Sequence, residues 1–338
     1  MESKDFLAAK YVVALPNATN PKVFLAIDTV HLATLSFLLY NPFSLKGKLF
    51  KWVFKFSCIH FNWLAKIVLP KVQFEESNFI KYLNKKLKKQ FTSSVYIATA
   101  KDKIVIQLIA DNAIYGYLKF PISPIGISRL KNEQLAFETL SKNGLVSSLV
   151  YKGSYNRVPF IIVPNIEGSI GEISENEKDI VIDGFKKEPH YLLRNHPRII
   201  LLKNQLQEAK FDDLNNLLQD LIQASQFHYK EVYEHGDFAP WNLVRTKNGL
   251  VPFDFEYYTE NGLEYLDEIK FHYQIESLLK GEKGINLIQA ISKQVDVPEF
   301  NIIFPIFLIK EILIKNETSE DLSYEFELLK SSKILNRI

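Results

Sequence analysis

Residues 235 to 256, HGDFAPWNLVRTKNGLVPFDFE, constrain the possible fold more than any other stretch of the chain. An Asn-Gly pair at 248 and 249 separates two runs rich in Leu and Val, which predicts a β-hairpin because Asn and Gly accept the positive φ values of a tight turn. Such a hairpin holds Asn242 near the start of one strand and Asp254 near the end of the other. Two oxygen ligands that face each other suit Mg²⁺, which accepts one or two protein groups besides phosphates and waters.

Asp237 lies on the same stretch, five residues before Asn242. The spacing Asp-x-x-x-x-Asn followed by an Asp-Phe-x turn is the one that the catalytic and metal loops of protein kinases use. The form HGDFAPWN, with Gly236 where protein kinases have Arg, resembles the aminoglycoside and choline phosphotransferase branch of the protein-kinase-like fold. The alternative interpretation is that Asp, Asn and Asn-Gly are ordinary hairpin and turn residues.

The resemblance implies an α+β, bilobal protein-kinase-like fold, with a small antiparallel-sheet N-lobe and a mainly helical C-lobe. The expected domains are a basic N-terminal extension with an amphipathic helix at 1–93, the N-lobe and hinge at 94–166, and the C-lobe with the catalytic and metal loops at 167–338. At 338 residues with 47% apolar content, the chain is long enough for two lobes with full cores.

The resemblance also implies a set of nucleotide-binding residues, of which Lys119 is the first along the chain. Three short strands are expected between residues 93 and 120, and Lys119 lies near the end of the third, where the family carries the lysine that contacts the α and β phosphates. A helix is expected at 128–142, and within it Glu133 is the expected partner that orients this lysine, with Glu138 as the alternative. The first turn contains no glycine-rich phosphate loop, which the small-molecule branch commonly lacks too.

Residues 157–168, RVPFIIVPNIEG, are expected to form an apolar strand that runs into the hinge between the lobes. The resemblance assigns the backbone groups around Val163, Asn165 and Ile166 to the purine edge of the nucleotide. An ordinary strand and turn is the other interpretation. The order of strands, lysine, helix glutamate, apolar strand, catalytic loop and metal loop along the chain favours the hinge.

The implied activity is transfer of the γ-phosphate of ATP or GTP to a hydroxyl group of a small molecule. Asp237 is then the catalytic residue that orients the hydroxyl and accepts its proton, while Asn242 and Asp254 bind Mg²⁺. His235 is expected to brace the loop, and Asp267 to be a structural hydrogen-bond partner. A catalytically inactive nucleotide-binding protein of the same fold, acting as an interaction module, is the alternative from another class.

Charge is distributed unevenly along the chain. Residues 1–103 hold 16 Lys and Arg against 6 Asp and Glu, a net of +10, and the remaining 235 residues hold 25 against 33, a net of −8. Cys58 is the only cysteine, and the N-terminus lacks the pattern of a signal peptide, so a cytoplasmic protein is expected. No nucleic-acid partner is expected.

Residues 45–69 predict a helix with a lysine stripe and a broad apolar surface of aromatic and aliphatic residues. One interpretation is an interfacial helix that contacts anionic membrane, which would place the protein peripherally at the inner membrane face. The other is a helix packed into the domain with only its lysines in water. The apolar run at 23–40 is interpreted as a strand and a buried helix, because Asp28 within it is costly in a bilayer.

The acceptor is the least determined part of the prediction. The N-terminal segment contains LPNATNPKVFLAID at 15–28 and LYNPFS at 39–44. With these it is similar to a front segment in kinase-like proteins of bacterial envelope polysaccharide systems, which implies a sugar or glycolipid acceptor. An aminoglycoside or an amino-alcohol such as choline is the alternative, since the acidic balance of residues 104–338 suits a cationic acceptor. Residues 172–232 are expected to be helical, with His228 at the end of a helix at 211–228, and residues 301–314 to form a buried helix too short for a bilayer.

Overall fold

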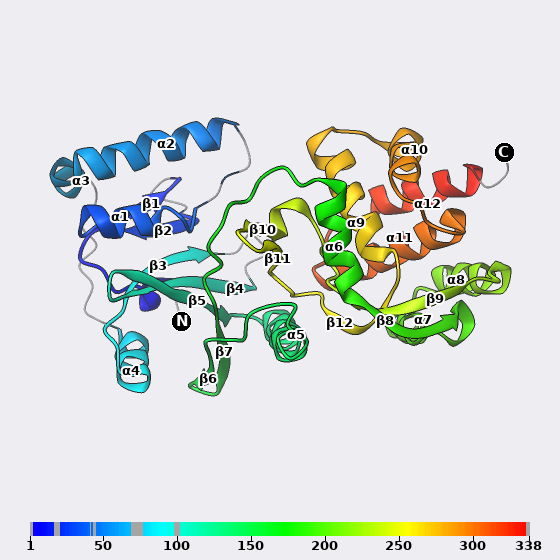
Figure 1. Cartoon of the computed structure of the whole chain (residues 1–338), viewed down its shortest axis with the longest axis horizontal. Helices are drawn as coiled ribbons and strands as arrows, with labels where there is room; N and C mark the ends of the chain where they lie inside the picture. The colour runs from blue at the N-terminus through cyan, green and yellow to red at the C-terminus, as the bar shows by residue number, and fades with distance from the viewer. Residues whose placement is uncertain are drawn as a thin grey trace. The chain divides into compact units, whose positions relative to one another are not determined.

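The computed structural model describes residues 3–16, 21–40, 42, 45–68, 77–97 and 102–335, and it confirms the α+β class. The chain divides into two compact units (Figure 1). The first comprises Met1–Leu130 and Ser147–Asn165, and the second comprises Lys131–Val146 and Ile166–Ile338.

The first unit is built on a seven-stranded antiparallel sheet with the order β1-β2-β3-β4-β5-β7-β6. The three strands expected between residues 93 and 120 are present as β3, β4 and β5. The expected domain boundary at residue 93 falls within this sheet, because β2 is hydrogen-bonded to β3. The strands are β1 (Val12–Leu15), β2 (Val23–Ala26), β3 (Thr92–Ile97), β4 (Lys103–Ala110), β5 (Ala113–Pro121), β6 (Tyr151–Tyr155) and β7 (Val158–Val163).

Both faces of this sheet are covered, as the alternation of buried residues along β1 and β2 shows. Val12 and Phe24 belong to one apolar cluster, with side chains of α4, whereas Val13 and Leu25 belong to another, with side chains of α1 and α2. The helical elements of this unit are η1 (Ser3–Phe6), α1 (Val30–Ser36), α2 (Leu45–His60), α3 (Asn62–Val68) and α4 (Asn78–Leu87), and α5 (Pro124–Leu140) begins here and continues into the second unit.

The single helix expected at 45–69 is instead two helices, α2 and α3, which are interrupted at Phe61. The side chain of Asn62 donates a hydrogen bond to the Cys58 carbonyl at 3.0 Å, and a second to the Ile27 carbonyl at 3.0 Å. In a continuous helix the backbone N–H of residue 62 would take that first carbonyl. Residue 69, the expected end of the helix, lies outside the described residues.

The second unit is mainly helical and packs around α11 (Phe300–Glu317), which includes the buried helix expected at 301–314. None of the helices among the described residues is long and apolar enough to cross a membrane. The other helical elements are α6 (Glu175–Phe185), η2 (Leu193–Asn195), α7 (Pro197–Glu208), α8 (Asp212–Ala224), η3 (Pro240–Asn242), α9 (Leu266–Gln274), the π-helix η4 (Ile275–Leu279), α10 (Gly284–Gln294) and α12 (Ser323–Leu335).

The expectation that residues 172–232 are helical is confirmed for α6, α7 and α8 and is wrong for other parts of the region. This region contains β8 (Lys186–Leu192) and most of β9 (His228–Glu234), which form a three-stranded antiparallel sheet with β12 (Thr259–Leu263) in the order β12-β9-β8. His228 begins β9 and is not part of the preceding helix. The strand β8, KKEPHYL, shows no alternation of polar and apolar residues, so its sequence does not indicate a strand and tertiary pairing decides its conformation.

The hairpin predicted at residues 243–255 is confirmed. Its strands are β10 (Leu243–Thr246) and β11 (Gly249–Pro252), paired with Leu243 opposite Pro252 and Thr246 opposite Gly249. Only Gly249 has a positive φ, at 113°, whereas Asn248 does not. The hydroxyl of Thr246 completes the turn by accepting a hydrogen bond from the Asn248 N–H at 3.1 Å.

Candidate active site

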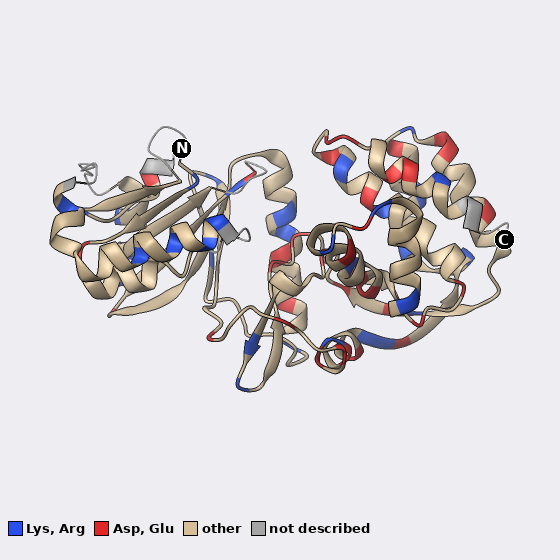
Figure 2. Cartoon of the chain, turned by 90° about the horizontal axis from the view of Figure 1, so that it is seen from above, with Lys and Arg blue, Asp and Glu red and all other residues tan. Residues whose placement is uncertain are grey.

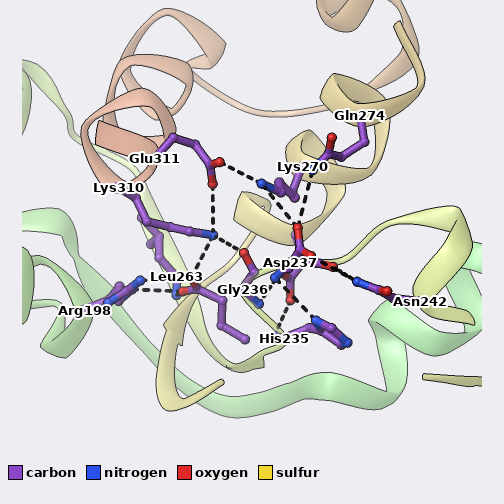
Figure 3. A network of polar contacts seen from close by, with 12 residues as sticks. Arg198, His235, Gly236, Asp237, Asn242, Leu263, Lys270, Gln274, Lys310 and Glu311 are labelled. Atoms are coloured by element: carbon purple, nitrogen blue, oxygen red, sulfur yellow. Dashed lines mark hydrogen bonds and ion pairs between the residues drawn. The ribbon is translucent and has the colours of Figure 1, made fainter. Parts of the chain in front are cut away.

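The loop between β9 and β10 presents Asp237, the predicted catalytic residue, within a network of polar contacts (Figure 3). The Asn242 side-chain nitrogen Nδ2 donates to the Asp237 carbonyl at 2.8 Å and to the Asp237 carboxylate oxygen Oδ2 at 3.1 Å. Asp237 is about one-third exposed, whereas Asn242 is buried. The structure therefore brings the predicted catalytic Asp and a predicted metal ligand together, with a carboxylate that solvent can reach.

Asp267 holds the backbone of this loop, which confirms its expected structural role. Its carboxylate accepts hydrogen bonds from the backbone N–H groups of His235, at 2.6 Å, and Gly236, at 2.9 Å. Gly236 has a φ of 83°, and a Cβ atom added there would lie 2.4 Å from the Tyr257 carbonyl oxygen. The loop therefore requires glycine at this position for both its conformation and its close packing.

His235 braces the loop from the side, as expected, because both of its ring nitrogens are occupied. Nδ1 lies 3.3 Å from the Asp237 backbone nitrogen, which donates to it, and Nε2 lies 2.9 Å from the Phe253 carbonyl oxygen. A neutral ring protonated at Nε2 satisfies both contacts, since a carbonyl only accepts and a backbone N–H only donates. The ring thereby ties the loop between β9 and β10 to the end of β11.

A buried ionic cluster lies behind the loop. Glu234, fully buried at the end of β9, accepts two hydrogen bonds of 3.0 Å from the Arg198 guanidinium and lies 3.2 Å from the Lys310 ammonium. Burial opposes ionisation of Glu234, but these two cations outweigh it and lower the pKa of the carboxyl. Lys310 also donates to the Gly236 carbonyl at 3.0 Å, so this cluster fixes the loop at a second backbone position.

Two residues of α9 reach the Asp237 carboxylate directly, and sequence reasoning missed both. Lys270 Nζ lies 3.4 Å from Asp237 Oδ1 and 2.6 Å from Glu311 Oε2, and Gln274 Nε2 donates to Asp237 Oδ1 at 3.4 Å (Figure 3). Burial disfavours the charged form of Lys270, but the Glu311 and Asp237 carboxylates outweigh it and raise the pKa of the ammonium. The available signal was spacing, because positions 267, 270 and 274 lie on one helical face.

The predicted metal ligands occupy the open end of the β10–β11 hairpin. The Phe253 backbone N–H donates to the Asn242 carbonyl at 3.0 Å, which extends the pairing by one residue beyond the strands. Asp254 follows immediately, with a φ of 67° that is uncommon for a residue other than glycine. Because Asn242 uses its Nδ2 group toward Asp237, its amide oxygen is left for a metal. One carboxylate and one amide oxygen are the donors that Mg²⁺ prefers, so this set fits the expected ion.

The remaining predicted site residues are divided between the units. Lys119 is buried in the first unit on β5, where it lies opposite Val105 of β4 and Ile161 of β7. Val163 is the last residue of β7, and the boundary between the units, at Asn165 and Ile166, falls in the predicted hinge segment. Their proposed contacts with a nucleotide stay predictions.

Glu133 lies in the part of α5 that belongs to the second unit, and its side chain is 1% exposed. This part of the helix is attached to the segment after Asp254, because the Asn132 side chain donates to the Glu256 carbonyl at 3.0 Å. Glu138, the alternative partner for the lysine, accepts a hydrogen bond from Gln134 within the same helix at 2.8 Å. The pairing of Glu133 with Lys119 stays a prediction.

No protein-family model matches the sequence, and comparison with curated proteins finds no match. Among solved structures, the chain is similar to a thermostable mutant of an aminoglycoside phosphotransferase in a ternary complex with ADP and hygromycin B, with a TM-score of 0.51, 9% sequence identity, and coverage of 77% of this chain and 98% of that chain. It also matches an aminoglycoside phosphotransferase in complex with GDP and kanamycin, with a TM-score of 0.41, 18% identity, and coverage of 70% of this chain and 91% of that chain. At these identities the likeness concerns the fold, and the first match confirms the expected protein-kinase-like fold.

Proposed function

We propose that the chain is a phosphotransferase that moves the γ-phosphate of ATP or GTP to a hydroxyl group of a small molecule. The observation that carries the proposal is the Asp237 carboxylate, which is partly exposed and is held by Asn242, Lys270 and Gln274. Phosphoryl transfer requires positioning and charge neutralisation more than covalent assistance from the protein. A fixed carboxylate beside a pair of oxygen ligands for Mg²⁺ meets both requirements.

In this proposal each residue has one task. Asp237 orients the acceptor hydroxyl and accepts its proton as the oxygen attacks the γ-phosphorus, while the bond from that phosphorus to the β–γ bridging oxygen breaks and ADP or GDP leaves. Asn242 and Asp254 hold Mg²⁺, which supplies positive charge for the phosphate oxygens when it is bound. The braces behind the loop, Asp267 and Lys310, keep Asp237 in place through hydrogen bonds to the backbone of the two preceding residues, His235 and Gly236.

The nucleotide contacts belong to the same proposal. In the first unit, Lys119 contacts the α and β phosphates, and the backbone of Val163 and Asn165, with that of Ile166, reads the purine edge. Glu133 orients the lysine. These assignments depend on the resemblance of the sequence to small-molecule kinases.

For the acceptor we propose a sugar or glycolipid of envelope polysaccharide metabolism. A glycolipid is presented at a membrane surface, and peripheral contact of residues 45–69 with anionic membrane is part of this proposal. Exposed apolar side chains on α2 and α3 support it. An aminoglycoside or an amino-alcohol such as choline is the alternative acceptor, and the net charge of −8 over residues 104–338 supports that class.

The test uses the full chain with Mg²⁺ and γ-labelled ATP or GTP against a panel of sugars, glycolipid extracts, aminoglycosides and choline. We expect label in one acceptor class, and Asp237→Asn to lower the transfer rate by a factor of about 10² to 10⁴ while nucleotide binding persists. Asp254→Ala should abolish the dependence of nucleotide binding on Mg²⁺. Asp220→Asn, at an exposed position of α8, is the matched control and should transfer at the unaltered rate.

Two outcomes would contradict the proposal in different ways. Undiminished transfer by Asp237→Asn would remove Asp237 as the base. Binding of the Mg²⁺ nucleotide without a labelled product in the whole panel would favour the inactive nucleotide-binding module instead.

A further inference from the structure

An apolar face of α2 and α3 points outward from the first unit. On α2 it consists of Leu49, Trp52, Val53 and Phe56, which follow the spacing i, i+3, i+4, i+7 of one helical side. Leu49 is 64% exposed and Trp52 is 63% exposed, although large apolar residues are usually buried. The face continues on α3 with Trp63, Leu64 and Ile67. These seven residues are called the α2–α3 face.

The α2–α3 face is not the side that holds the helices on the domain. The opposite side of α2 carries the buried Cys58 together with Phe50 and Phe54, which pack against the cluster formed by β1, β2 and α1. The Asn62 side chain and the Lys66 ammonium, which donates to the Asp28 carbonyl at 2.5 Å, attach α3. The helices are therefore anchored by one apolar side and expose a second one.

Positive charge borders the exposed side. Lys48, Lys51 and Lys55 follow the spacing i, i+3, i+7 beside the apolar residues, and residues 45–68 contain no Asp or Glu. Among the described residues no ion pair joins Lys48 or Lys55 to a carboxylate. Figure 2 shows α2 with bands of Lys and without acidic residues along its length. An occupant of this face must therefore tolerate positive charge or supply negative charge.

The combination favours a lipid surface over other occupants. Trp and Phe are the residues that settle at the boundary between headgroups and acyl chains, and lysines beside them meet anionic headgroups. A second copy of the chain would bring the same lysines face to face in a symmetric contact, which like charges disfavour. A nucleic acid would contact the lysines but would leave most of the aliphatic side chains in water.

We propose that the α2–α3 face docks on an anionic bilayer, with Trp52, Phe56 and Trp63 inserted at the level of the headgroups and the lysines Lys48, Lys51 and Lys55 on phosphate groups. The inference deepens the membrane contact proposed above and does not depend on phosphotransfer. It requires no spanning helix, because an interfacial helix lies in the plane of the surface.

The experiment measures co-sedimentation of the full chain, without nucleotide, with vesicles of phosphatidylcholine alone and of phosphatidylcholine with 30% phosphatidylglycerol. We expect binding to the anionic vesicles only, and weaker binding as salt is added. Replacement of Lys48, Lys51 and Lys55 by Gln should lower the partition coefficient by about 100-fold, at roughly fivefold per lysine. Trp52→Ser with Trp63→Ser should lower it by at least about tenfold.

Matched controls test whether vesicle binding depends on the α2–α3 face or only on the overall positive charge of the N-terminal region. Replacement of Lys85, Lys86 and Lys88 by Gln removes the same charge from the end of α4, and Ile180→Ser removes an apolar side chain of comparable exposure from α6. Both should bind vesicles like the unaltered chain. Equal losses from the α4 lysines would overturn the assignment to the α2–α3 face.

Tryptophan fluorescence gives a second readout that does not depend on sedimentation. Two of the three tryptophans, Trp52 and Trp63, lie on the face, so in a Trp241→Phe background a blue shift on anionic vesicles reports their insertion. Absence of both binding and shift would overturn the proposal. Self-association that Trp52→Ser and Trp63→Ser abolish, without vesicle binding, would assign the face to a second copy. Asp237→Asn should bind vesicles normally, so a failure here is distinct from a failure of the phosphotransferase proposal.

Discussion

Three buried lysines of the second unit and the lysines of α2 have opposite environments. Lys178, Lys270 and Lys310 are at most 6% exposed, and each contacts a carboxylate: Glu175 at 2.6 Å, Glu311 at 2.6 Å and Glu234 at 3.2 Å, respectively. The lysines of α2 lie in a segment without acidic residues. Buried lysines that are paired in this way fix internal geometry, whereas Lys48 and Lys55, which no ion pair joins to a carboxylate among the described residues, can meet an outside partner.

This difference explains why the net charges of the two parts of the chain give little information on their own. Part of the excess of acidic residues after residue 103 lies inside the protein and not on its surface. Glu234 and Glu311, for example, are buried and form ion pairs with buried cations. The excess of lysines before residue 104 is not neutralised within residues 45–68. Substitutions of the buried lysines should therefore have large effects on stability, whereas substitutions on α2 should have small effects on stability and change the binding of an outside partner.

The largest effect is expected at Lys270. Lys270→Met removes the nearer ammonium partner of the buried Glu311 carboxylate and leaves only Lys310, 3.8 Å away, which should lower the free energy of unfolding by about 3 kcal/mol. It also removes a contact with Asp237 Oδ1, so the rate of phosphotransfer to the acceptor found in the panel should fall. Urea denaturation measures the first effect, and transfer assays at a temperature where the variant stays folded measure the second.

A double substitution separates the structural role of Lys270 from its positioning role. Lys270→Met with Glu311→Leu removes both charges, and replacing a buried ion pair by apolar residues is often close to neutral, so most of the stability should return. The transfer rate should stay low, with kcat affected more than KM, because Asp237 still lacks its cationic neighbour. Recovery of the rate together with the stability would make Lys270 a structural residue only.

A smaller, pH-dependent effect is expected at His272, which is 2% exposed on α9. Burial, together with the Lys178 ammonium 3.2 Å from Nε2, lowers the pKa of His272 from 6.5 to about 4, although Glu175, Glu276 and Asp179 act in the opposite direction. The unfolded chain therefore binds a proton between these two pH values that the folded chain does not bind. Stability from this group is fully present above about pH 6.5 and is lost as the pH falls toward 4, by up to about 1.4 kcal/mol per pH unit.

His272→Gln tests this assignment, because the substitution removes the titrating ring and leaves the surrounding carboxylates in place. The difference in free energy of unfolding between the two proteins should change with pH only between about 4 and 6.5. A difference that is constant over this range would show that His272 titrates alike in the folded and unfolded chains. Equilibrium denaturation at several pH values provides the measurement.

The sequence was most informative where local chemistry fixes geometry. The turn signal between two strands correctly predicted the hairpin that carries Asn242 and Asp254 at its open end. The contact between Asp237 and Asn242 is a finding of the structure. The role of Asp267 followed from the resemblance and is confirmed by two hydrogen bonds. These contacts depend on short stretches of chain, whose conformations side chains and turns largely determine.

Prediction failed where distant segments decide the structure. Lys270 and Glu311 are separated by 41 positions, and nothing in either local sequence indicates that they form a pair beside Asp237. The strands β8 and β9 depend on pairing with each other and with β12, so their polar sequences were interpreted as helical. At the break between α2 and α3, the Asn62 side chain donates a hydrogen bond to the distant Ile27 carbonyl. The helical spacing of apolar residues cannot predict such a contact.

The smallest effect on stability is expected on the α2–α3 face, and it sharpens the comparison with Lys270. Trp52→Ser with Trp63→Ser removes two side chains that are 63% and 65% exposed, so little apolar burial is lost on folding. The free energy of unfolding should change by no more than about 0.5 kcal/mol per site, as for ordinary surface positions. A loss of several kcal/mol in urea denaturation would mean that these tryptophans pack against the domain. A loss of about 0.5 kcal/mol or less per site would show that the two tryptophans do not stabilise the folded chain. Their exposure would then have to serve a partner outside the chain, as the vesicle experiment tests.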